Sequence, residues 1–177
     1  MSEIRKQSRQ PTMLIAGLGS SHGDDQFGWE VIDQLQGCDV CLKKITHSQA
    51  LLNHLDTITH LIICDANSET SHEPGEIACY TWPQLPELQR IPASSHASSL
   101  TGTLELATET FPDLMKIHIW TVTGKNWKPL SSMSPQVLSA AKDVAELLQR
   151  NEIEPHTRGL QNPQFNKVGD RKSTRLN

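Results

Sequence analysis

The sequence predicts a single domain with a three-layer α/β/α fold, in which helices cover both faces of a mostly parallel, twisted sheet. Two observations lead to this fold class. Short apolar runs typical of buried strands alternate with amphipathic segments of helical length, in the order β-α-β-α-β-β-α-β-α. The chain has 177 residues, which is a suitable length for one domain.

The first strand is expected at residues 13–16, M-L-I-A, which are short and apolar as a central parallel strand should be. Residues 1–12 before it are expected to be disordered. A loop with three glycines leads into a helix expected over residues 25–36, where apolar side chains recur every three or four positions. Asp24 is expected to cap this helix.

The next elements continue the alternation of strands and helices. Residues 40–45 are expected to form a second strand, and their two lysines indicate a place near the sheet edge. Ser48 is expected to cap a short helix over residues 49–58. Residues 60–65, H-L-I-I-C-D, indicate a buried strand that ends in a carboxylate, and residues 75–82 indicate another strand.

The C-terminal half begins with a loop of small residues at 93–99, A-S-S-H-A-S-S, before a helix expected over residues 100–110. Residues 116–122 alternate as a strand does, and His118 within it is interpreted as structural. Ser134, followed by proline, is expected to open the last helix.

The two ends of the chain are polar. We therefore assign residues 1–12 to an N-terminal tail, residues 13–150 to the folded domain and residues 151–177 to a polar tail. No packed structure is expected from Glu154 onward. Residues 170–177, D-R-K-S-T-R-L-N, match the forward translation of a common sequencing adapter and are left out of the functional argument.

The composition argues against several classes of protein. The net charge is −4 and no long basic run occurs, which disfavours binding to nucleic acid or to an anionic membrane. No apolar run approaches the roughly 20 residues that cross a bilayer, and residues 1–11 lack the apolar core of a secretory signal. The isolated pair Cys38 and Cys41 is interpreted as ordinary thiols, not as a zinc or redox site. We therefore expect a cytoplasmic protein, and a monomer.

Acidic and imidazole side chains follow three of the expected strands. Asp24 and Asp25 lie where the first helix begins, and Asp65 ends a buried strand. His96 lies in the loop of small residues. Ligands bind beyond the carboxyl ends of the strands in open α/β sheets, so Asp65 is expected near Asp24 and Asp25. Two carboxylates and one imidazole suit a borderline divalent cation, with water or substrate in the remaining positions.

Each of these side chains also has a simpler interpretation. Capping statistics favour Asp24 as a helix cap over a metal ligand, and Asp25 would complement the helix dipole from the first turn. Asp65 would cap a turn, and His96 would be an ordinary loop histidine. His22 lies in the same glycine loop as Asp24 and Asp25, where it would support the site or face the substrate.

A rival interpretation is dinucleotide binding. Gly17, Gly19 and Gly23 follow a strand and precede a helix, but their spacing is wider than G-x-G-x-x-G. Two carboxylates at the position of the pyrophosphate would repel it. Asp39 lies at a suitable separation for a ribose contact, yet it precedes the second strand instead of ending it.

Several short motifs, in this order and spacing, resemble those of the nickel–iron hydrogenase maturation proteases. The resemblance extends from Met13 to Leu148, nearly all of the expected domain. Its motifs are a glycine loop with an acidic pair, an aspartate after an apolar strand, a Pro-Gly strand entry, a histidine loop and a Ser-Pro helix start. They are Gly17-Leu18-Gly19-Ser20 with Gly23-Asp24-Asp25-Gln26-Phe27-Gly28, Cys64-Asp65-Ala66, Pro74-Gly75-Glu76-Ile77, Ser95-His96-Ala97-Ser98-Ser99-Leu100 and Met133-Ser134-Pro135-Gln136-Val137.

The resemblance implies an endopeptidase that removes the C-terminal extension of a hydrogenase large-subunit precursor after nickel insertion. The family's nickel-contacting residues correspond here to Asp25, Asp65 and His96. The nickel implied is that of the substrate precursor, and neither an organic cofactor nor a conventional nucleophile is implied. A maturation chaperone that binds nickel or precursor without catalysis is the main alternative, and a dinucleotide-binding domain is a lesser one.

Three places depart from the family's pattern. Ser20 replaces the usual asparagine, and Gln26 replaces the usual glycine. After the strand that ends near Val122, residues 123–127, T-G-K-N-W, replace the common G-x-E-P. The three residues expected to contact nickel are unaffected.

Overall fold

The computed structural model describes residues 12–84 and 95–161. Within them, five strands form one sheet in the order β2-β1-β3-β5-β4. The strands are β1 (Met13–Leu18), β2 (Cys41–Ile45), β3 (His60–Asn67), β4 (Ile77–Thr81) and β5 (Lys116–Thr123). All neighbouring pairs are parallel except β4 and β5, which are antiparallel. The predicted mostly parallel sheet is confirmed, and the lysine-bearing strand β2 lies at an edge as expected.

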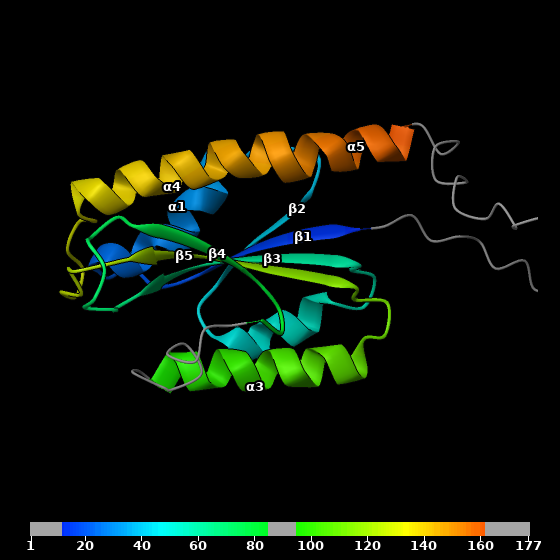
Figure 1. The fold of residues 1–177 in the computed structure, drawn as a ribbon, viewed down its shortest axis with the longest axis horizontal. Coiled ribbons are helices and arrows are strands. Elements are labelled where there is room, and N and C mark those ends of the chain that lie inside the picture. The colour runs from blue at the N-terminus through cyan, green and yellow to red at the C-terminus, as the bar shows by residue number, and fades with distance from the viewer. Residues whose placement is uncertain (1–11, 85–94, 162–177) are drawn as a thin grey trace, which may run out of the picture.

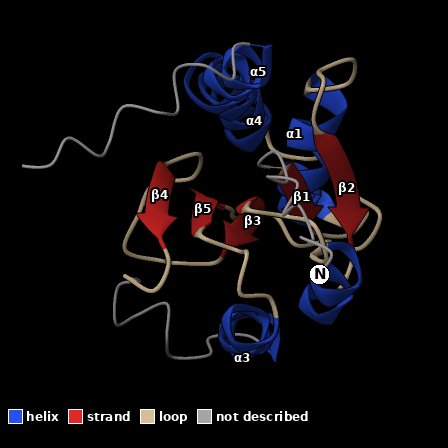
Figure 2. Cartoon of the chain, turned by 90° about the vertical axis from the view of Figure 1, so that its right-hand side faces the viewer, coloured by secondary structure: helices blue, strands red, loops and turns tan. Residues whose placement is uncertain are grey.

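Helices cover both faces of this sheet, so the predicted three layers are also confirmed (Figure 1). α1 (Phe27–Gln34) and α4 (Pro135–Leu148) lie on one face. α3 (Ser95–Thr110) and the 3₁₀ helix η2 (Ser48–His54) lie on the other face. Figure 2, which views the sheet nearly end-on, shows the strands between these two layers. None of the helices in residues 12–84 and 95–161 combines the length and apolar character that a membrane span requires.

Two apolar cores lie between the layers because successive side chains of a strand point to opposite faces. Ile15 and Ile62 point towards α1 and α4, where Val137 is among their fully buried neighbours. Leu14 and Leu61 are also fully buried, but they belong to the core beneath α3. Central strands that are buried on both faces explain the continuous apolar runs in the sequence.

The start of α1 packs directly on the ends of β1 and β3. A methyl group at Gly28 would overlap the carbonyl oxygens of Leu18 and Cys64, and one at Gly17 would overlap the carbonyl oxygen of Gly28. Only glycine permits this approach of two backbones. The segment between β1 and α1 is therefore held close to the end of β3.

The Gly28→Ala variant is expected to lose about 1–3 kcal/mol of unfolding free energy, because the added methyl group meets backbone oxygens that cannot move aside. Gly102→Ala is the matched control. Gly102 lies in α3 with nothing within 4 Å of an added Cβ, so alanine there is expected to stabilise the protein by about 0.5–1 kcal/mol. Urea unfolding of both variants provides the measurement, and a shift of both in the same direction would contradict the packing described.

The N-terminal elements differ in detail from the prediction. Thr12 is not disordered, because its carbonyl oxygen accepts hydrogen bonds from the backbone N–H groups of Thr59 and His60. The predicted first helix begins with a separate 3₁₀ turn, η1 (Gly23–Gln26). Ser48 is the first residue of η2 and not its cap, and its hydroxyl oxygen lies 3.2 Å from Thr103 Oγ1 of α3.

The helical C-terminus extends beyond the prediction. α4 continues through a π-helical turn, η3 (Gln149–Ile153), into α5 (Glu154–Gln161). The expectation of no packed structure from Glu154 onward is therefore wrong. Ile153 is only 4% exposed and anchors this extension to the core. The pair of Arg158 and Glu154, at 3.1 Å, supports it at helical spacing.

The remaining differences concern ends of elements. Residues 95–99, predicted as loop, belong to α3, while 93–94 lie outside the described residues. Residues 1–11 and 162–177 also lie outside them, including residues 170–177, which match the adapter translation. The division into residues 1–12, 13–150 and 151–177 and the expected monomer stay predictions.

Candidate active site

Asp25 and Asp65 lie at the carboxyl ends of neighbouring strands. Asp25 is part of η1, which follows β1, and Asp65 lies in the C-terminal half of β3. In the parallel ladder between these strands, Gly17 pairs with Cys64, the residue before Asp65. The two carboxylates are close enough for the charge of Asp25 to act on Asp65. Two of the three expected nickel-contacting residues, Asp25 and Asp65, are therefore brought together, and they form the acid pair of this site.

The electrostatics of this pair favour a cation. Burial and the neighbouring Asp25 carboxylate raise the pKa of Asp65 to about 7, against a smaller opposite effect of the Ala66 backbone N–H. Two adjacent carboxylates repel each other when both are ionised, and a cation between them relieves that repulsion. Strongly raised carboxyl pKa values of this kind are typical of functional sites.

Ser20 holds the side chain of Asp25. Its hydroxyl donates a hydrogen bond to Asp25 Oδ2 at 2.5 Å, and its backbone N–H donates to the Asp25 carbonyl oxygen at 3.3 Å. The residue that departs from the family's asparagine thus contacts an expected nickel-contacting residue. Sequence reasoning missed this role because a serine in a glycine loop has no pattern that reveals its partner.

Asp24 does not cap the following helix, so that prediction is wrong. Its fully buried carboxylate accepts three backbone hydrogen bonds from the segment after β5. Oδ2 accepts from Lys125 at 2.8 Å and from Asn126 at 2.9 Å, and Oδ1 accepts from Ser134 at 2.7 Å. Burial alone would raise the pKa of Asp24, but these N–H groups outweigh it and hold the pKa below its ordinary value.

The loop between β5 and α4 is held against η1 by further bonds. Gln26 Nε2 donates to the carbonyl oxygens of Gly23 and Ser131, at 3.0 and 2.9 Å. His22 Nδ1 accepts a hydrogen bond from the Leu130 backbone N–H at 3.0 Å. Gln26 is another residue that departs from the family's pattern, so the departures lie in one connected region beside the acid pair.

His96 lies in the first turn of α3 and not in a loop. Figure 1 shows the N-terminal end of α3 at the same end of the molecule as the carboxyl ends of β1 and β3. Asp65 alternates with Leu61 and Ile63, which belong to the core beneath α3. The backbone thus places His96 and Asp65 on the same side of the sheet, and the role of His96 stays a prediction.

A second group of polar side chains lies where β3 and β5 begin. Glu152 Oε1 is 3.0 Å from His118 Nδ1, and Glu152 Oε2 is 3.9 Å from His60 Nε2. Burial, followed by the charges of Lys116, His118 and His156, lowers the pKa of His60 to about 3, so its ring is neutral at neutral pH. Sequence reasoning missed this cluster, because no spacing pattern joins two strand starts to a helix near the C-terminus.

Comparison with known proteins identifies one matching family model and several solved structures with a similar fold. A family model described as "HycI: Hydrogenase maturation protease" matches residues 46–151, more than half of the chain. The search of curated proteins finds no match.

Three solved structures with a similar fold are distant from this chain in sequence. The hydrogenase maturating endopeptidase HybD from E. coli is 20% identical with a TM-score of 0.65, and the match covers 79% of this chain and 94% of that chain. HybD from Thermococcus kodakarensis, a NiFe hydrogenase maturation protease, is 20% identical with a TM-score of 0.67, over 78% and 97% of the two chains. HycI from the same organism is 18% identical with a TM-score of 0.62, over 80% and 92%. At these identities the similarity establishes the fold alone.

Proposed function

Because the chain belongs to the hydrogenase maturation protease family, we propose that Asp25, Asp65 and His96 are the residues with which it engages nickel in its substrate. The protein is a peptidase that cleaves the C-terminus of the hydrogenase large subunit. The finer proposal is that the substrate is a precursor that already carries nickel, and that this nickel is the recognition element.

The observation that carries the proposal is the pair Asp25 and Asp65 at the ends of β1 and β3. Carboxylate oxygens with an imidazole suit a borderline divalent ion such as nickel. Ser20 orients Asp25 through its hydrogen bond, and Asp65 gives up its proton when the cation is engaged. A divalent ion held there would position the nearby peptide, polarise its carbonyl group or activate a water molecule.

The direct test uses a nickel-loaded large-subunit precursor from the matching hydrogenase. Incubation with the protein is expected to release a C-terminal peptide, seen as a loss of mass, while a nickel-free precursor stays intact. His96→Ala is expected to abolish release, whereas His54→Ala, at an exposed position in η2, is the matched control. Precursor that binds but keeps its mass would indicate a non-catalytic chaperone instead. An active His96→Ala variant would remove His96 from the site.

Cleavage is expected to increase as the pH rises from about 6 to about 8. The pKa of Asp65 is raised to about 7 in the free protein. Below that pH its carboxyl group carries a proton that competes with the cation, so kcat/KM falls. Initial rates at low precursor concentration across this range provide the measurement. A rate that is constant over the range, or that decreases with pH, would contradict the assignment of Asp65.

Ser20→Ala is expected to lower kcat/KM about ten- to a hundredfold without unfolding the protein. The variant loses one hydrogen bond to the Asp25 carboxylate, and a bond to a charged group is worth about 1.5–3 kcal/mol, which corresponds to that range. Ser20→Asn should recover part of the activity, since an asparagine amide also donates a hydrogen bond. Ser21→Ala, at the exposed neighbouring position, serves as the control. Equal rates for Ser20→Ala and Ser21→Ala would show that the bond to Asp25 does not matter for cleavage.

A further inference from the structure

We propose that His60, His118 and Glu152 form a zinc-binding site at the opposite end of the sheet from the acid pair. His60 is the first residue of β3, and His118 lies near the start of β5. Glu152 belongs to η3, the π-helical turn between α4 and α5. The site is independent of the proposed function, because it shares no residue with Asp25, Asp65 or His96.

The geometry of the three side chains fits a small divalent ion. Each offers one ligand atom, and the three atoms lie within 4.8 Å of one another. Zinc bonds of about 2.0–2.1 Å in a tetrahedron place neighbouring ligand atoms about 3.4 Å apart. Glu152 Oε1 lies 3.0 Å from His118 Nδ1, and Glu152 Oε2 lies 3.9 Å from His60 Nε2, so the two carboxylate oxygens approach the two rings at separations on either side of that value. Two histidines and one glutamate are an established zinc ligand set that leaves a fourth position for water.

His60 provides a second, independent observation. The side chain is buried, with the residue 9% exposed, and its Nε2 atom has no hydrogen-bond partner. A buried polar nitrogen without a partner is unfavourable and uncommon in folded proteins. His60 belongs to the ligand group with His118 and Glu152, and its Nε2 atom lies 3.9 Å from Glu152 Oε2. A bound ion would supply the partner that His60 Nε2 lacks.

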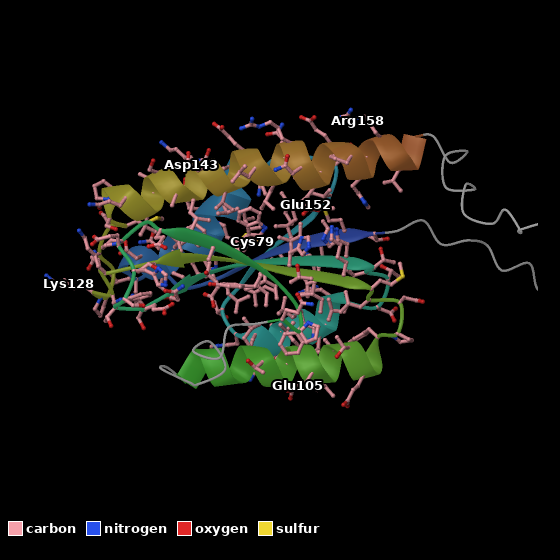
Figure 3. The ribbon with its side chains drawn as sticks, viewed as in Figure 1. Cys79, Glu105, Lys128, Asp143, Glu152 and Arg158 are labelled. Atoms are coloured by element: carbon pink, nitrogen blue, oxygen red, sulfur yellow. The ribbon has the colours of Figure 1, made fainter. Side chains whose placement is uncertain are left out.

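The backbone around Glu152 is also unusual. π-helical turns are rare and are often found at functional sites. Here the turn leaves both Ile153 and Glu152 largely shielded from solvent, although they are adjacent in sequence. Figure 3 shows Glu152 on the side of the long helix that faces the sheet. An ion at this point would join the start of two strands to the helical C-terminus.

Charged side chains near the site would compete with a bound ion for Glu152. Lys116 Nζ lies 3.4 Å from Glu152 Oε2, and its side chain is 49% exposed, so it is free to turn towards solvent. His156 acts electrostatically on His60. Without an ion, the same side chains form a network in which Glu152 pairs with His118 and Lys116. Zinc would displace Lys116 from that network, since two like charges at one carboxylate repel each other.

The test measures zinc binding and not cleavage, so its result is separate from that of the proposed function. Full-length protein carrying Asp25→Asn and Asp65→Asn is stripped of metal with a chelator, which removes the acid pair as a competing site. Titration with zinc chloride by calorimetry is expected to give one bound ion per chain. Zinc is also expected to raise the midpoint of thermal unfolding, because it binds only the folded cluster.

Glu152→Gln in the same background is expected to weaken zinc binding at least about tenfold and to remove the thermal shift. Lys116→Gln should tighten binding, because it removes the competing charge. Glu76→Gln is the matched control: Glu76 pairs with His72 at 2.7 Å on the surface, outside the proposed site. If Glu152→Gln does not fold, His118→Gln replaces it. Equal zinc affinity in the Glu152 and Glu76 variants, or no binding by the parent, would overturn the proposal.

Discussion

Asp65→Asn is expected to abolish release of the C-terminal peptide while leaving the protein at least as stable as the unmodified chain at about pH 8. Asparagine keeps the shape of the side chain but loses the charge that attracts a cation. The loss of kcat/KM is expected to exceed about a hundredfold, since removing residues that only support a metal ligand already costs about 10–100-fold.

The expectation that Asp65→Asn loses activity but not stability follows from the raised pKa of Asp65. The pKa is raised to about 7 in the folded protein, above its ordinary value of about 4 in an unfolded chain. The folded state therefore holds more protons between these values, and the free energy of unfolding falls as the pH rises through this window. Asparagine removes this pH-dependent loss. Above about pH 7 the variant should thus unfold at an equal or higher urea concentration.

The two measurements are made on the same preparation at about pH 8: mass loss of the nickel-loaded precursor, and urea unfolding. A residue needed only for structure would lose activity and stability together. Asp113→Asn at the distant, exposed turn after α3 should leave activity unchanged and serves as the control. Full cleavage by Asp65→Asn would remove this carboxylate from the mechanism, and inactivity caused by unfolding would contradict the stability argument.

Asp24→Ala is expected to destabilise the protein by about 3–5 kcal/mol. It removes the acceptor of three backbone N–H groups, of Lys125, Asn126 and Ser134. Bonds to charged groups are worth about 1.5–3 kcal/mol each, but they are not additive when they share one acceptor. Domains are stable by only about 5–15 kcal/mol, so much of the total is lost.

The contribution of Asp24 depends on pH in the opposite sense to that of Asp65. Its folded-state pKa is lowered because the backbone N–H bonds outweigh burial. The stabilisation is therefore complete above the ordinary carboxyl pKa of about 4, and it disappears as the pH falls through the lower folded-state value. Acid unfolding of the unmodified chain should show this loss, and the Asp24→Ala variant should not.

Urea unfolding at neutral pH measures the effect of Asp24→Ala. If the alanine variant does not fold, Asp24→Asn provides a milder change that keeps one acceptor oxygen and should cost about 1–3 kcal/mol. Asp33→Ala is the matched control, because Asp33 is half-exposed and pairs with Lys44 at the surface, where such a pair is worth about 0–1 kcal/mol. Equal destabilisation by Asp24→Ala and Asp33→Ala would contradict the role given to Asp24.

The sequence was sufficient for those features that depend on local periodicity. The apolar run that begins at His60 predicted β3, and the helical spacing after Ser134 predicted α4. The proximity of Asp25 and Asp65 is also predictable from the sequence, because the carboxyl ends of parallel strands share one edge of a sheet. These predictions need no knowledge of which distant residues meet.

Features that depend on distant partners were not accessible from the sequence. Capping preference assigned Asp24 to its own helix, but tertiary contacts with the loop after β5 determine its role. The π-helical turn at Glu152 produces no recognisable pattern of apolar residues in the sequence. The sequence therefore does not predict that the helix continues past residue 153. The alternation of residues 116–122 as a strand favours a structural role for His118, and no acid lies near it in sequence in a place comparable to that of Asp24 and Asp25.

The three bonds of Asp24 also determine when the loop that carries Asp25 takes its final form. They join residues that are 101, 102 and 110 positions apart in the chain. Closing loops of this length costs conformational entropy before such contacts can stabilise the chain. During synthesis from the N-terminus, the acid pair is thus completed only after β5 and the start of α4 have been made and have docked. A partly synthesised chain that ends before Lys125 lacks all three donors to Asp24 and is therefore expected to be inactive.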